Sequence, residues 1–476
     1  MATGVQEHRL LLDGEWIETG EWLEVRSPYS GEVVGRLPRA GAEAVRRAVD
    51  AAARAMREEP LPAHRRAEIL DRTARLISER RDDLARTICA EAGKPLKAAR
   101  VEAERAVSTF TMASVEARRL AGDMVPMDAS VAGQGKLAFT MRVPIGVVGA
   151  ITPFNFPLNL VAHKVAPALA AGCAVVLKPA SQTPLSALLL AELELEAGLP
   201  AGWLNVIAGR AGEIGDVLVD DERVRLITFT GSSEVGWALR ERAARKKVLL
   251  ELGNSTPVLV EDDADLEQAA AKLAANAFAF AGQTCISVQR IYVRRPVFDE
   301  FLARFLPKVE ALRTGDPADE ATDVGPVIDA VSRERILAWI EEARAGGATV
   351  LTGGDADGVV VSPTVLTKVA PTMKVSCQEA FGPLVTVAPY DSLDEALALA
   401  NGTPYGLQAG IFTRDLGRAL AATRALEFGG ITVNEAPSFR ADQMPYGGTK
   451  ASGNTKEGPA YAVREMTEER LVVIQL

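Results

Sequence analysis

Two spacings of apolar residues alternate along the chain, and each predicts a different kind of element. Residues 41–121 carry apolar side chains three or four positions apart among many alanines, arginines and glutamates, which predicts about three helices with solvated, charged faces. From residue 151 onward, short apolar runs at 174–177, 204–207 and 226–229 alternate with helical stretches. Continuous apolar runs are typical of buried parallel strands, so this part predicts an α/β sheet that binds ligands at the carboxyl ends of its strands.

The same alternation returns further along the chain. Apolar runs at 290–293, 348–351 and 384–387 lie within residues 258–430 and predict a second α/β domain. The fold class predicted from the pattern is therefore α/β, with two parallel sheets.

Three other segments predict strands. Residues 1–40 alternate short apolar runs with Gly and Pro turns, which is typical of hairpins. Residues 136–151 predict strands that break at Pro144 and Gly146, and residues 470–476 form an apolar terminal strand. An apolar strand at the edge of a sheet needs a partner, from its own chain or from another.

Composition is typical of an ordinary soluble protein. The 476 residues suffice for two or three domains, and contents of 48% hydrophobic and 24% charged residues are usual for globular chains. The net charge is 53 − 63 = −10, which argues against a general binder of nucleic acids or anionic membranes. Residues 143–162 carry no charge, but Pro144, Pro153 and Pro157 favour a strand, a turn and a helix start over a membrane span.

Cysteine and histidine usage indicates a reducing, cytoplasmic location and no metal site. The four cysteines lie far apart in the sequence, and the three histidines are too scattered for a zinc site. Residues 1–10 include Gln6, Glu7, His8 and Arg9 and contain no apolar core of a signal peptide.

Candidate chemistry centres on Cys285, the last residue of the stretch FAGQTC. Residues 266–280 have apolar positions at helical spacing and follow Asp263 and Asp265, which favour a helix start. Gly282 predicts the helix end, because glycine adopts positive φ cheaply. A thiol just past a helix end becomes a nucleophile if its proton is withdrawn, the alternative being a small buried side chain.

Two further polar residues stand in apolar surroundings. Glu251 lies in the apolar run 248–252, where an acid is costly unless it is used. Asn155 lies in the proline-fixed turn ITPFNFP. With Cys285 they supply a thiol, a carboxylate and an amide donor. By contrast, Lys164 is expected to be a surface lysine without a role.

Seven motifs occur in one order along nearly the whole chain: ITPFNFP, KPASQTP, FTGSSEVG, LELG, FAGQTC, EAFGPL and PYGGTKASG. In these motifs the chain resembles the aldehyde dehydrogenase superfamily. The resemblance implies two parallel-sheet α/β domains plus a small β oligomerisation arm. It divides the chain into a cofactor-binding domain (1–125 and 148–252), a catalytic domain with the nucleophilic cysteine (253–432), the arm (126–147 and 455–476), and a substrate-lining loop that returns to the cofactor domain (433–454).

The resemblance also implies a mechanism. Cys285 attacks an aldehyde carbonyl, Asn155 and the Cys285 backbone N–H stabilise the oxyanion, hydride passes to a nicotinamide, and Glu251 activates water to hydrolyse the thioester. Relatives that pass the acyl group to coenzyme A generally lack this acid, so Glu251 favours hydrolysis. The alternatives are a CoA-acylating semialdehyde dehydrogenase, a cofactor-free cysteine hydrolase with His163 as base, and a non-catalytic relative. The family usually has a second glycine after ELG, and here Asn254 is expected to keep that turn because Asn tolerates the left-handed region.

The implied cofactor is NADP or NAD. No GxGxxG fingerprint follows a strand at the dinucleotide-binding spacing. Ser232 opens a helix that suits a pyrophosphate, and the resemblance places the adenosine ribose on Lys178 and the nicotinamide ribose on Glu379. Ser181 stands where many NAD-preferring relatives have glutamate, which predicts that NADP is accepted. The other cofactor-binding residues implied by the motifs are Thr152, Pro153, Phe154, Gly212, Phe229, Gly231, Leu252 and Phe381.

The substrate is the least specific prediction. The stretches CISVQR and FRADQMPYGG most resemble the lactaldehyde and phosphonoacetaldehyde dehydrogenase branch. Arg440 suits a carboxylate, phosphate or phosphonate, so the hypothesis is a short polar or anionic aldehyde, the alternative being an Arg440 that pairs with Asp442 or faces solvent. The predicted substrate-binding residues are Phe156, His163, Thr284, Ile286, Arg440 and Tyr446, with a core position as the alternative for His163. The resemblance implies a homodimer or homotetramer.

Overall fold

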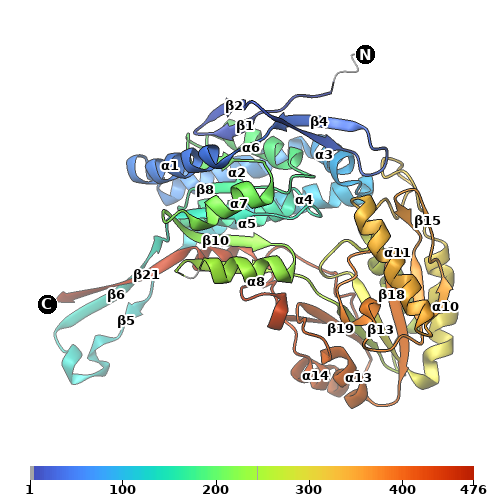
Figure 1. Cartoon of the computed structure of the whole chain (residues 1–476). Coiled ribbons are helices and arrows are strands. Elements are labelled where there is room, and N and C mark those ends of the chain that lie inside the picture. The colour runs from blue at the N-terminus through green and yellow to red at the C-terminus, as the bar shows by residue number, and fades with distance from the viewer. Residues whose placement is uncertain (1–4, 244) are drawn as a thin grey trace.

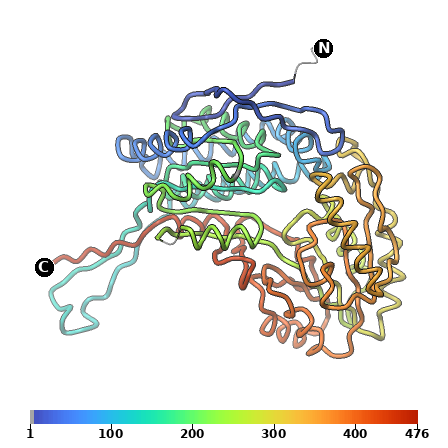
Figure 2. The backbone as a smooth tube through the Cα atoms, in the orientation of Figure 1, coloured from blue at the N-terminus to red at the C-terminus, as the bar shows by residue number. Residues whose placement is uncertain are grey.

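The computed structural model describes residues 5–243 and 245–476. Two seven-stranded sheets, each covered by helices, lie beside one another, and a narrow three-stranded arm projects from the first (Figure 1). The tube view shows that the C-terminal strand runs out along this arm, beside a segment from the first third of the chain (Figure 2). The predicted α/β class with two largely parallel sheets is confirmed.

The first sheet has the order β11-β10-β7-β8-β9-β1-β2, with β7 to β11 parallel and the hairpin β1–β2 added antiparallel. Its strands are β1 (Leu10–Leu12), β2 (Glu15–Ile17), β7 (Val147–Ile151), β8 (Val175–Lys178), β9 (Leu204–Val206), β10 (Val224–Thr230) and β11 (Lys247–Glu251). The helices that belong with it are α1 (Ala42–Glu58), α2 (Ala63–Glu79), α3 (Arg81–Ala92), α4 (Leu96–Arg119), α5 (Asn159–Ala171), α6 (Leu185–Glu196), α7 (Ala211–Asp220) and α8 (Ser233–Arg242). Residues 41–121 therefore form four helices where about three were predicted, because the Gly93–Pro95 break separates α3 from α4.

The second sheet has the order β14-β17-β18-β13-β12-β19-β20, parallel except for β14. Its strands are β12 (Thr256–Val260), β13 (Val288–Arg294), β14 (Thr349–Thr352), β17 (Thr364–Thr367), β18 (Leu384–Tyr390), β19 (Gln408–Phe412) and β20 (Gly430–Val433). Its helices are α9 (Leu266–Ala277), α10 (Phe298–Glu310), α11 (Ala330–Ala345), α12 (Lys374–Cys377), α13 (Leu393–Asn401) and α14 (Leu416–Ala425).

The arm consists of β5 (Met124–Val125), β6 (Lys136–Pro144) and β21 (Thr467–Gln475), in the order β21-β6-β5. β21 pairs antiparallel with β6 along its whole length and is itself an edge strand. Several apolar side chains on it are exposed, including Leu471 at 58% and Val473 at 48%. The remaining elements are the hairpins β3 (Trp22–Arg26) with β4 (Val33–Pro38) and β15 (Ala356–Asp357) with β16 (Val360–Val361), and the helix α15 (Pro459–Glu465).

Helix α5 is the most enclosed helix of the first domain. Every residue from Asn159 to Ala171 is buried, since α2, α4 and α15 pack on it from one side and the sheet from the other. A helix that is apolar all round belongs in a core. Its two basic residues, His163 and Lys164, are therefore buried as well, and the prediction of a surface position for Lys164 was wrong.

A buried ion pair supports the start of this helix. Lys94 pairs with Glu102, and both side chains are almost fully buried. Glu102 Oε1 accepts hydrogen bonds from the backbone N–H groups of Leu158 (3.0 Å) and Asn159 (3.1 Å), where a carboxylate also meets the positive end of the helix dipole. Removing one member of such a pair leaves an uncompensated buried charge and typically costs about 3–5 kcal/mol.

Candidate functional site

Three adjoining cavities make up the candidate site; two are lined by residues of both domains, and one by residues of the first domain alone. The largest has a volume of 560 Å³ and is lined by Asn155, Glu251 and Cys285, together with several residues that were predicted to bind the cofactor. A second, of 350 Å³, shares Glu234 with it. A third, of 150 Å³, shares Leu160 and Cys285 with the largest. Cys285 therefore stands at the junction of the large and the small cavity.

The carboxyl ends of the parallel strands deliver the first domain's share of the site. Asn155 follows the end of β7, Lys178 ends β8, Ser232 follows β10, and Glu251 ends β11. Since parallel strands end at one edge of a sheet, residues up to about 100 positions apart meet there. The second domain contributes Cys285, on the loop between α9 and β13.

The loop before Cys285 is an unusual turn. Helix α9 ends at Ala277, not at Gly282 as predicted, and Phe280, Ala281 and Gly282 follow with φ angles of 49°, 52° and 69°. Left-handed conformations are uncommon for non-glycine residues and persist where the surroundings enforce them. At Gly282 a Cβ atom would lie 2.1 Å from the Gly382 carbonyl oxygen, so glycine is required.

The side chain of Gln283 fastens this turn. Its Oε1 accepts a hydrogen bond from Ile328 N (2.8 Å), and its Nε2 donates to the carbonyl oxygens of Phe280 and Pro326 (3.3 Å each). Its own carbonyl oxygen accepts a hydrogen bond from Asn155 Nδ2 at 2.9 Å. The thiol loop of one domain and the amide of the other are thus held together directly.

Two hydrogen-bond donors remain available near the sulfur. The bond to Gln283 uses one N–H of the Asn155 amide and leaves the second. Within residues 5–243 and 245–476, the backbone N–H of Cys285 donates to no acceptor. Two donors beside a nucleophile are the arrangement that stabilises an oxyanion.

Cys285 and Glu251 both resist ionisation in this site. Burial raises the pKa of the Cys285 thiol to about 12, while a hydrogen bond with Tyr446 acts in the opposite direction. Burial, and then the charge of Glu457, raise the pKa of Glu251 well above its usual value. The carboxylate oxygens of Glu251 are buried and have no hydrogen-bond partner in the described part of the chain. A carboxylate with a raised pKa is a stronger base near neutral pH, which suits proton abstraction.

A glycine makes room for the Glu251 carboxylate. A Cβ atom on Gly447, in the PYGG motif, would lie 2.6 Å from Glu251 Oε1 and 1.9 Å from the Thr455 carbonyl oxygen. The motif thus has a packing reason, beyond its place in the loop.

The 560 Å³ cavity and the 350 Å³ cavity, named the large and the middle cavity from here on, suit a dinucleotide. Ser232 caps helix α8, accepts a hydrogen bond from Val235 N (3.4 Å) and lines the large cavity, so the helix N-terminus faces that space. Glu379 lines the same cavity, and burial raises its pKa to about 7. Lys178 lines the middle cavity, and burial lowers its pKa to about 8.

Most predicted cofactor-binding residues meet in these two cavities. The large one includes Pro153, Phe154, Gly231, Ser232, Leu252, Glu379 and Phe381, and the middle one includes Lys178 and Phe229. Thr152, Ser181 and Gly212 are not among the lining residues. Thr152 is buried, Ser181 donates through Oγ to the Gly209 carbonyl oxygen (2.8 Å), and Gly212 lies in α7.

Sequence reasoning missed Arg335 and Trp339, which line the large cavity from helix α11. No motif surrounds them, and only the packing of α11 beside the cavity brings them there. Asn254 also differs from expectation, since its φ is not positive. Its side chain donates to Thr256 Oγ1 (2.8 Å) and to the Gln408 carbonyl oxygen (3.0 Å), and its backbone N–H donates to Glu379 Oε1 (3.0 Å).

The small cavity gathers five of the six predicted substrate-binding residues. They are Phe156, Thr284, Ile286, Arg440 and Tyr446. His163 is not among the lining residues. It lies behind Arg440, with its Nε2 2.9 Å from Asp442 Oδ1 and 3.3 Å from Arg440 Nη2, and burial lowers its pKa to about 4.

Two arginines line the small cavity, and sequence reasoning found only one. Arg105, on helix α4, donates through Nη2 to Asp442 Oδ1 (2.8 Å). Arg440 donates through Nη2 to Glu457 Oε2 (3.0 Å), so it pairs with neither Asp442 nor solvent. The Nε atoms of both arginines are buried without a partner in the described residues.

Glu457 organises the charges behind the cavity. It accepts hydrogen bonds from Lys164 (3.2 Å) and Arg440 (3.0 Å), and Lys164 also donates to Thr228 Oγ1 (3.0 Å). Burial alone would raise the pKa of Glu457, but the charges of Lys164 and Arg440 hold it down to about 2. Glu251, like the half-buried Glu379, is therefore an acid of the site that makes no ion pair within the described residues.

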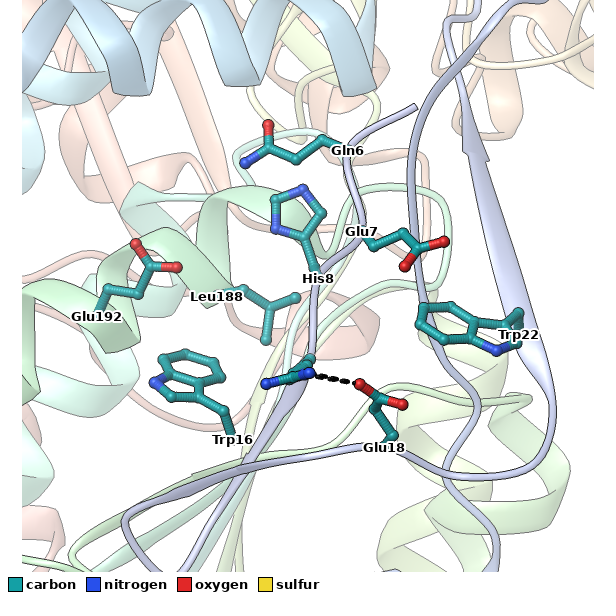
Figure 3. A pocket seen from close by; sticks show the side chains of 9 residues that line it. Gln6, Glu7, His8, Trp16, Glu18, Trp22, Leu188 and Glu192 are labelled. Carbon is teal, nitrogen blue, oxygen red and sulfur yellow. Dashed lines mark hydrogen bonds and ion pairs between the residues drawn. The ribbon is translucent and has the colours of Figure 1, made fainter. Parts of the chain in front are cut away.

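A separate hollow of 460 Å³ lies on the surface of the N-terminal strands (Figure 3). Its lining side chains include Trp16 and Trp22, and Arg9 donates through Nε to Glu18 (2.8 Å). It shares no lining residue with the three cavities. Across the described residues, no cluster of three or more His, Cys, Asp or Glu side chains could hold a metal ion, and no helix is long and apolar enough to cross a membrane.

Comparisons with known proteins match this geometry. The model of the "Aldehyde dehydrogenase family" matches residues 16–472. The chain is 46% identical to the 3-sulfolactaldehyde dehydrogenase of Priestia aryabhattai over 474 residues, which cover 100% of this chain and 99% of the relative.

Two solved structures are similar over 99% of both chains. Aldehyde dehydrogenase 21 from Physcomitrella patens, in complex with the reaction product succinate, superposes with a TM-score of 0.97 at 38% identity. The NADP-dependent glyceraldehyde-3-phosphate dehydrogenase from Bacillus halodurans, complexed with NADP, superposes with a TM-score of 0.96 at 38% identity.

Proposed function

Since this chain belongs to the aldehyde dehydrogenase family and is an NAD(P)-dependent aldehyde dehydrogenase, we propose that it oxidises a short aldehyde with an anionic tail. The product is the carboxylate, released by hydrolysis of a thioester on Cys285. The observation that carries the anionic tail is the pair of arginines in the small cavity.

Arg105 and Arg440 are only partly satisfied. Each makes an ion pair with one carboxylate, and each keeps a buried Nε–H donor without an acceptor in the described residues. Each guanidinium has more N–H donors than its one carboxylate uses, and both residues line the same small cavity, so a ligand there should supply an acceptor. An anionic group that accepts from guanidinium N–H donors meets this need.

The compounds in the names of the three relatives above all carry an anionic group. Sulfolactaldehyde carries a sulfonate, succinate a second carboxylate, and glyceraldehyde 3-phosphate a phosphate. In each molecule the anionic group lies a few atoms from the aldehyde or from its oxidised carbon. A cavity of 150 Å³ is small for a ligand site, which favours compounds of this size. We take 3-sulfolactaldehyde as the first compound to test.

The first chemical step joins Cys285 to the aldehyde. The thiol loses its proton, and the sulfur attacks the carbonyl carbon to give a thiohemiacetal oxyanion. The second N–H of the Asn155 amide and the backbone N–H of Cys285 donate to that oxygen. Each such donor is worth about 3–4 kcal/mol of transition-state stabilisation in comparable sites.

The second step releases the acid. A bound NADP or NAD supplies the hydride acceptor, and Ser232, Lys178 and Glu379 would hold it. Loss of hydride leaves a thioester on Cys285. Glu251, which lines the same cavity, removes a proton from the attacking water, and its raised pKa makes it a stronger base than an exposed glutamate.

The geometry bears on the alternatives. A cofactor-free hydrolase needs a histidine base beside Cys285, but His163 is hydrogen-bonded to Asp442 and lies outside the lining of the small cavity. Transfer of the acyl group to coenzyme A does not need Glu251, whereas here the carboxylate shares the large cavity with the thiol. Hydrolysis is therefore the proposed outcome.

The proposal assigns a role to each part of the chain. Residues 1–125 and 148–252 hold the cofactor, 253–432 supply the nucleophile, and 433–454 line the substrate cavity. The arm predicted at 126–147 and 455–476 is formed by β5, β6 and β21, whereas Glu457 and helix α15 pack against the first domain. The exposed apolar edge strand of the arm supports assembly as a homodimer or homotetramer.

Replacing the proposed base tests hydrolysis. Glu251→Gln removes proton abstraction from water, so we expect one reduced nicotinamide per site in a burst, followed by turnover about 10²–10⁴-fold slower than wild type. Stopped-flow absorbance at 340 nm measures both phases, and Cys285→Ser, which should show no burst, is the control. Unchanged steady turnover in Glu251→Gln would remove this residue from the mechanism.

Replacing Arg105 tests the anionic tail. Sulfolactaldehyde and lactaldehyde differ only in the sulfonate, so Arg105→Gln should lower kcat/KM about 10- to 100-fold for the first and little for the second, because only the first loses a charged hydrogen bond. Arg100 is a half-buried arginine on the same helix that lines none of the three cavities, and Arg100→Gln is the matched control. Arg440→Ala should likewise lower kcat/KM more for sulfolactaldehyde than for lactaldehyde. An equal loss on both aldehydes would contradict the anionic-tail proposal.

Cofactor preference depends on residue 181. A glutamate there would repel the 2′-phosphate of NADP, so Ser181→Glu should lower kcat/KM for NADP about tenfold or more and leave NAD nearly unchanged. Ser181→Gln, which has the same shape without the charge, should change neither strongly. Steady-state rates with both cofactors measure this. A large preference for NAD in the wild-type protein would overturn the proposed use of NADP.

Charged substitutions on the arm test whether it mediates assembly. Leu471→Glu combined with Val473→Glu places two carboxylates on its exposed apolar face, and we expect sedimentation to show a smaller assembly than wild type, because burying unpaired charges is costly. Glu468→Gln on the same strand is the control. A wild-type protein that already sediments as a monomer would contradict the oligomer.

A further inference from the structure

The nucleophile has a hydrogen-bond partner that the mechanism above does not use. The hydroxyl oxygen of Tyr446 lies 2.8 Å from Cys285 Sγ, and this is its one hydrogen bond among the described residues. Tyr446 is 2% exposed. Its backbone is fixed by two hydrogen bonds with Glu457, one in each direction (3.1 Å and 2.6 Å). The hydroxyl is therefore presented to the sulfur by a rigid frame.

A cation lies against the ring that carries this hydroxyl. The guanidinium carbon of Arg440 is 3.8 Å from the centroid of the Tyr446 ring. Arg440 is held in place by its ion pair with Glu457 (3.0 Å). A positive charge over a phenol ring draws electron density from it and makes the O–H a better donor.

The direction of the bond depends on the state of the sulfur. While the thiol keeps its proton, either group can donate. Once the sulfur is a thiolate, it can only accept, and the phenol must donate. Burial, together with the neighbouring thiol, raises the pKa of Tyr446 well above its usual value, so the phenol keeps its own proton.

We propose that the Tyr446 hydroxyl, with Arg440 stacked on its ring, donates a hydrogen bond that stabilises the Cys285 thiolate before it attacks the aldehyde. This inference deepens the proposed function and rests on Cys285 being its nucleophile. The proton of the thiol leaves for Glu251 or solvent, and Tyr446 transfers none. When the carbon–sulfur bond forms, the negative charge moves from sulfur to the carbonyl oxygen, and the donors Asn155 and Cys285 N–H take over.

Other groups that face the thiol also change its pKa, and they must be told apart from the Tyr446 hydroxyl. Glu251 and Glu379 raise its pKa, and Arg440 lowers it by charge. None of these changes in Tyr446→Phe, which keeps the ring, its contact with Arg440, and its packing against Ile286 and Leu407. The variant removes one hydroxyl and leaves the shape of the site.

The experiment measures the thiol without substrate or cofactor. The rate of alkylation of Cys285 by iodoacetamide is followed against pH by mass spectrometry of its peptide, in wild type and Tyr446→Phe. We expect the thiol to titrate about one pH unit higher in the variant, with alkylation near pH 7.5 about tenfold slower. Arg440→Gln should show a change in the same direction.

Two further measurements complete the test. Tyr390→Phe removes a buried phenol hydroxyl that bonds Glu261 at 2.6 Å, far from the thiol in the chain, and should leave the alkylation profile unchanged. In turnover, Tyr446→Phe should lower kcat/KM for charged and neutral aldehydes alike.

An unchanged alkylation profile in Tyr446→Phe would overturn the proposal. So would a loss confined to anionic aldehydes, because it would make Tyr446 a substrate contact only. Because alkylation needs no aldehyde, these outcomes stay distinct from failure of the anionic-substrate proposal, which is tested through Arg105.

Discussion

One buried ammonium group joins the two halves of the site. Lys94 Nζ lies 3.6 Å from the ring centroid of Phe156, next to Asn155, and 4.6 Å from that of Phe280, in the turn before Cys285. The same ammonium pairs with Glu102, which holds the N-terminus of α5. A charge buried this deeply must keep its partners, so the loops from both domains are fixed to one point. The hydrogen bond from Asn155 to the Gln283 carbonyl oxygen completes this link, on which the proposed oxyanion site depends.

Most charged residues around this point are paired. Glu102 has Lys94, Asp442 has Arg105, and Glu457 has Lys164 and Arg440. Glu251 is buried among them without a cation of its own. Leaving a carboxyl in this state costs stability, and sites where proteins accept that cost are usually functional. The same balance explains why Arg440 can stack on Tyr446 and still face the substrate cavity, since Glu457 holds only one of its nitrogen atoms.

The sequence predicted the parts of the site that depend on local chemistry. Cys285, Glu251 and Asn155 lie in short apolar motifs, and the strand that ends at Glu251 appears as a continuous apolar run. It could not predict contacts made by packing between distant elements. Arg105 lies among many arginines on an amphipathic helix, and only the approach of α4 to the loop at 433–454 marks it as different. Lys164 was misplaced because the apolar pattern of α5 does not show that three helices enclose it. The end of α9 was misplaced because Phe280 and Ala281 adopt positive φ under tertiary constraint.

The position of Cys285 at the meeting point of two cavities has a consequence for the reaction. Residues predicted to bind the dinucleotide line the large cavity, and Arg105 and Arg440 line the small one. A carbonyl carbon bonded to the sulfur therefore has the anionic tail of its molecule drawn to one side and open space for a nicotinamide on the other. A nicotinamide bound in the large cavity would accept hydride from that carbon on the side away from the two arginines. In the proposed reaction, water would reach the thioester from the large cavity as well, where Glu251 lies, so hydride acceptance and hydrolysis would use the same space. The shape of the site would thus order the reaction, because the small cavity would keep the acyl group in place while the large one serves two steps in succession.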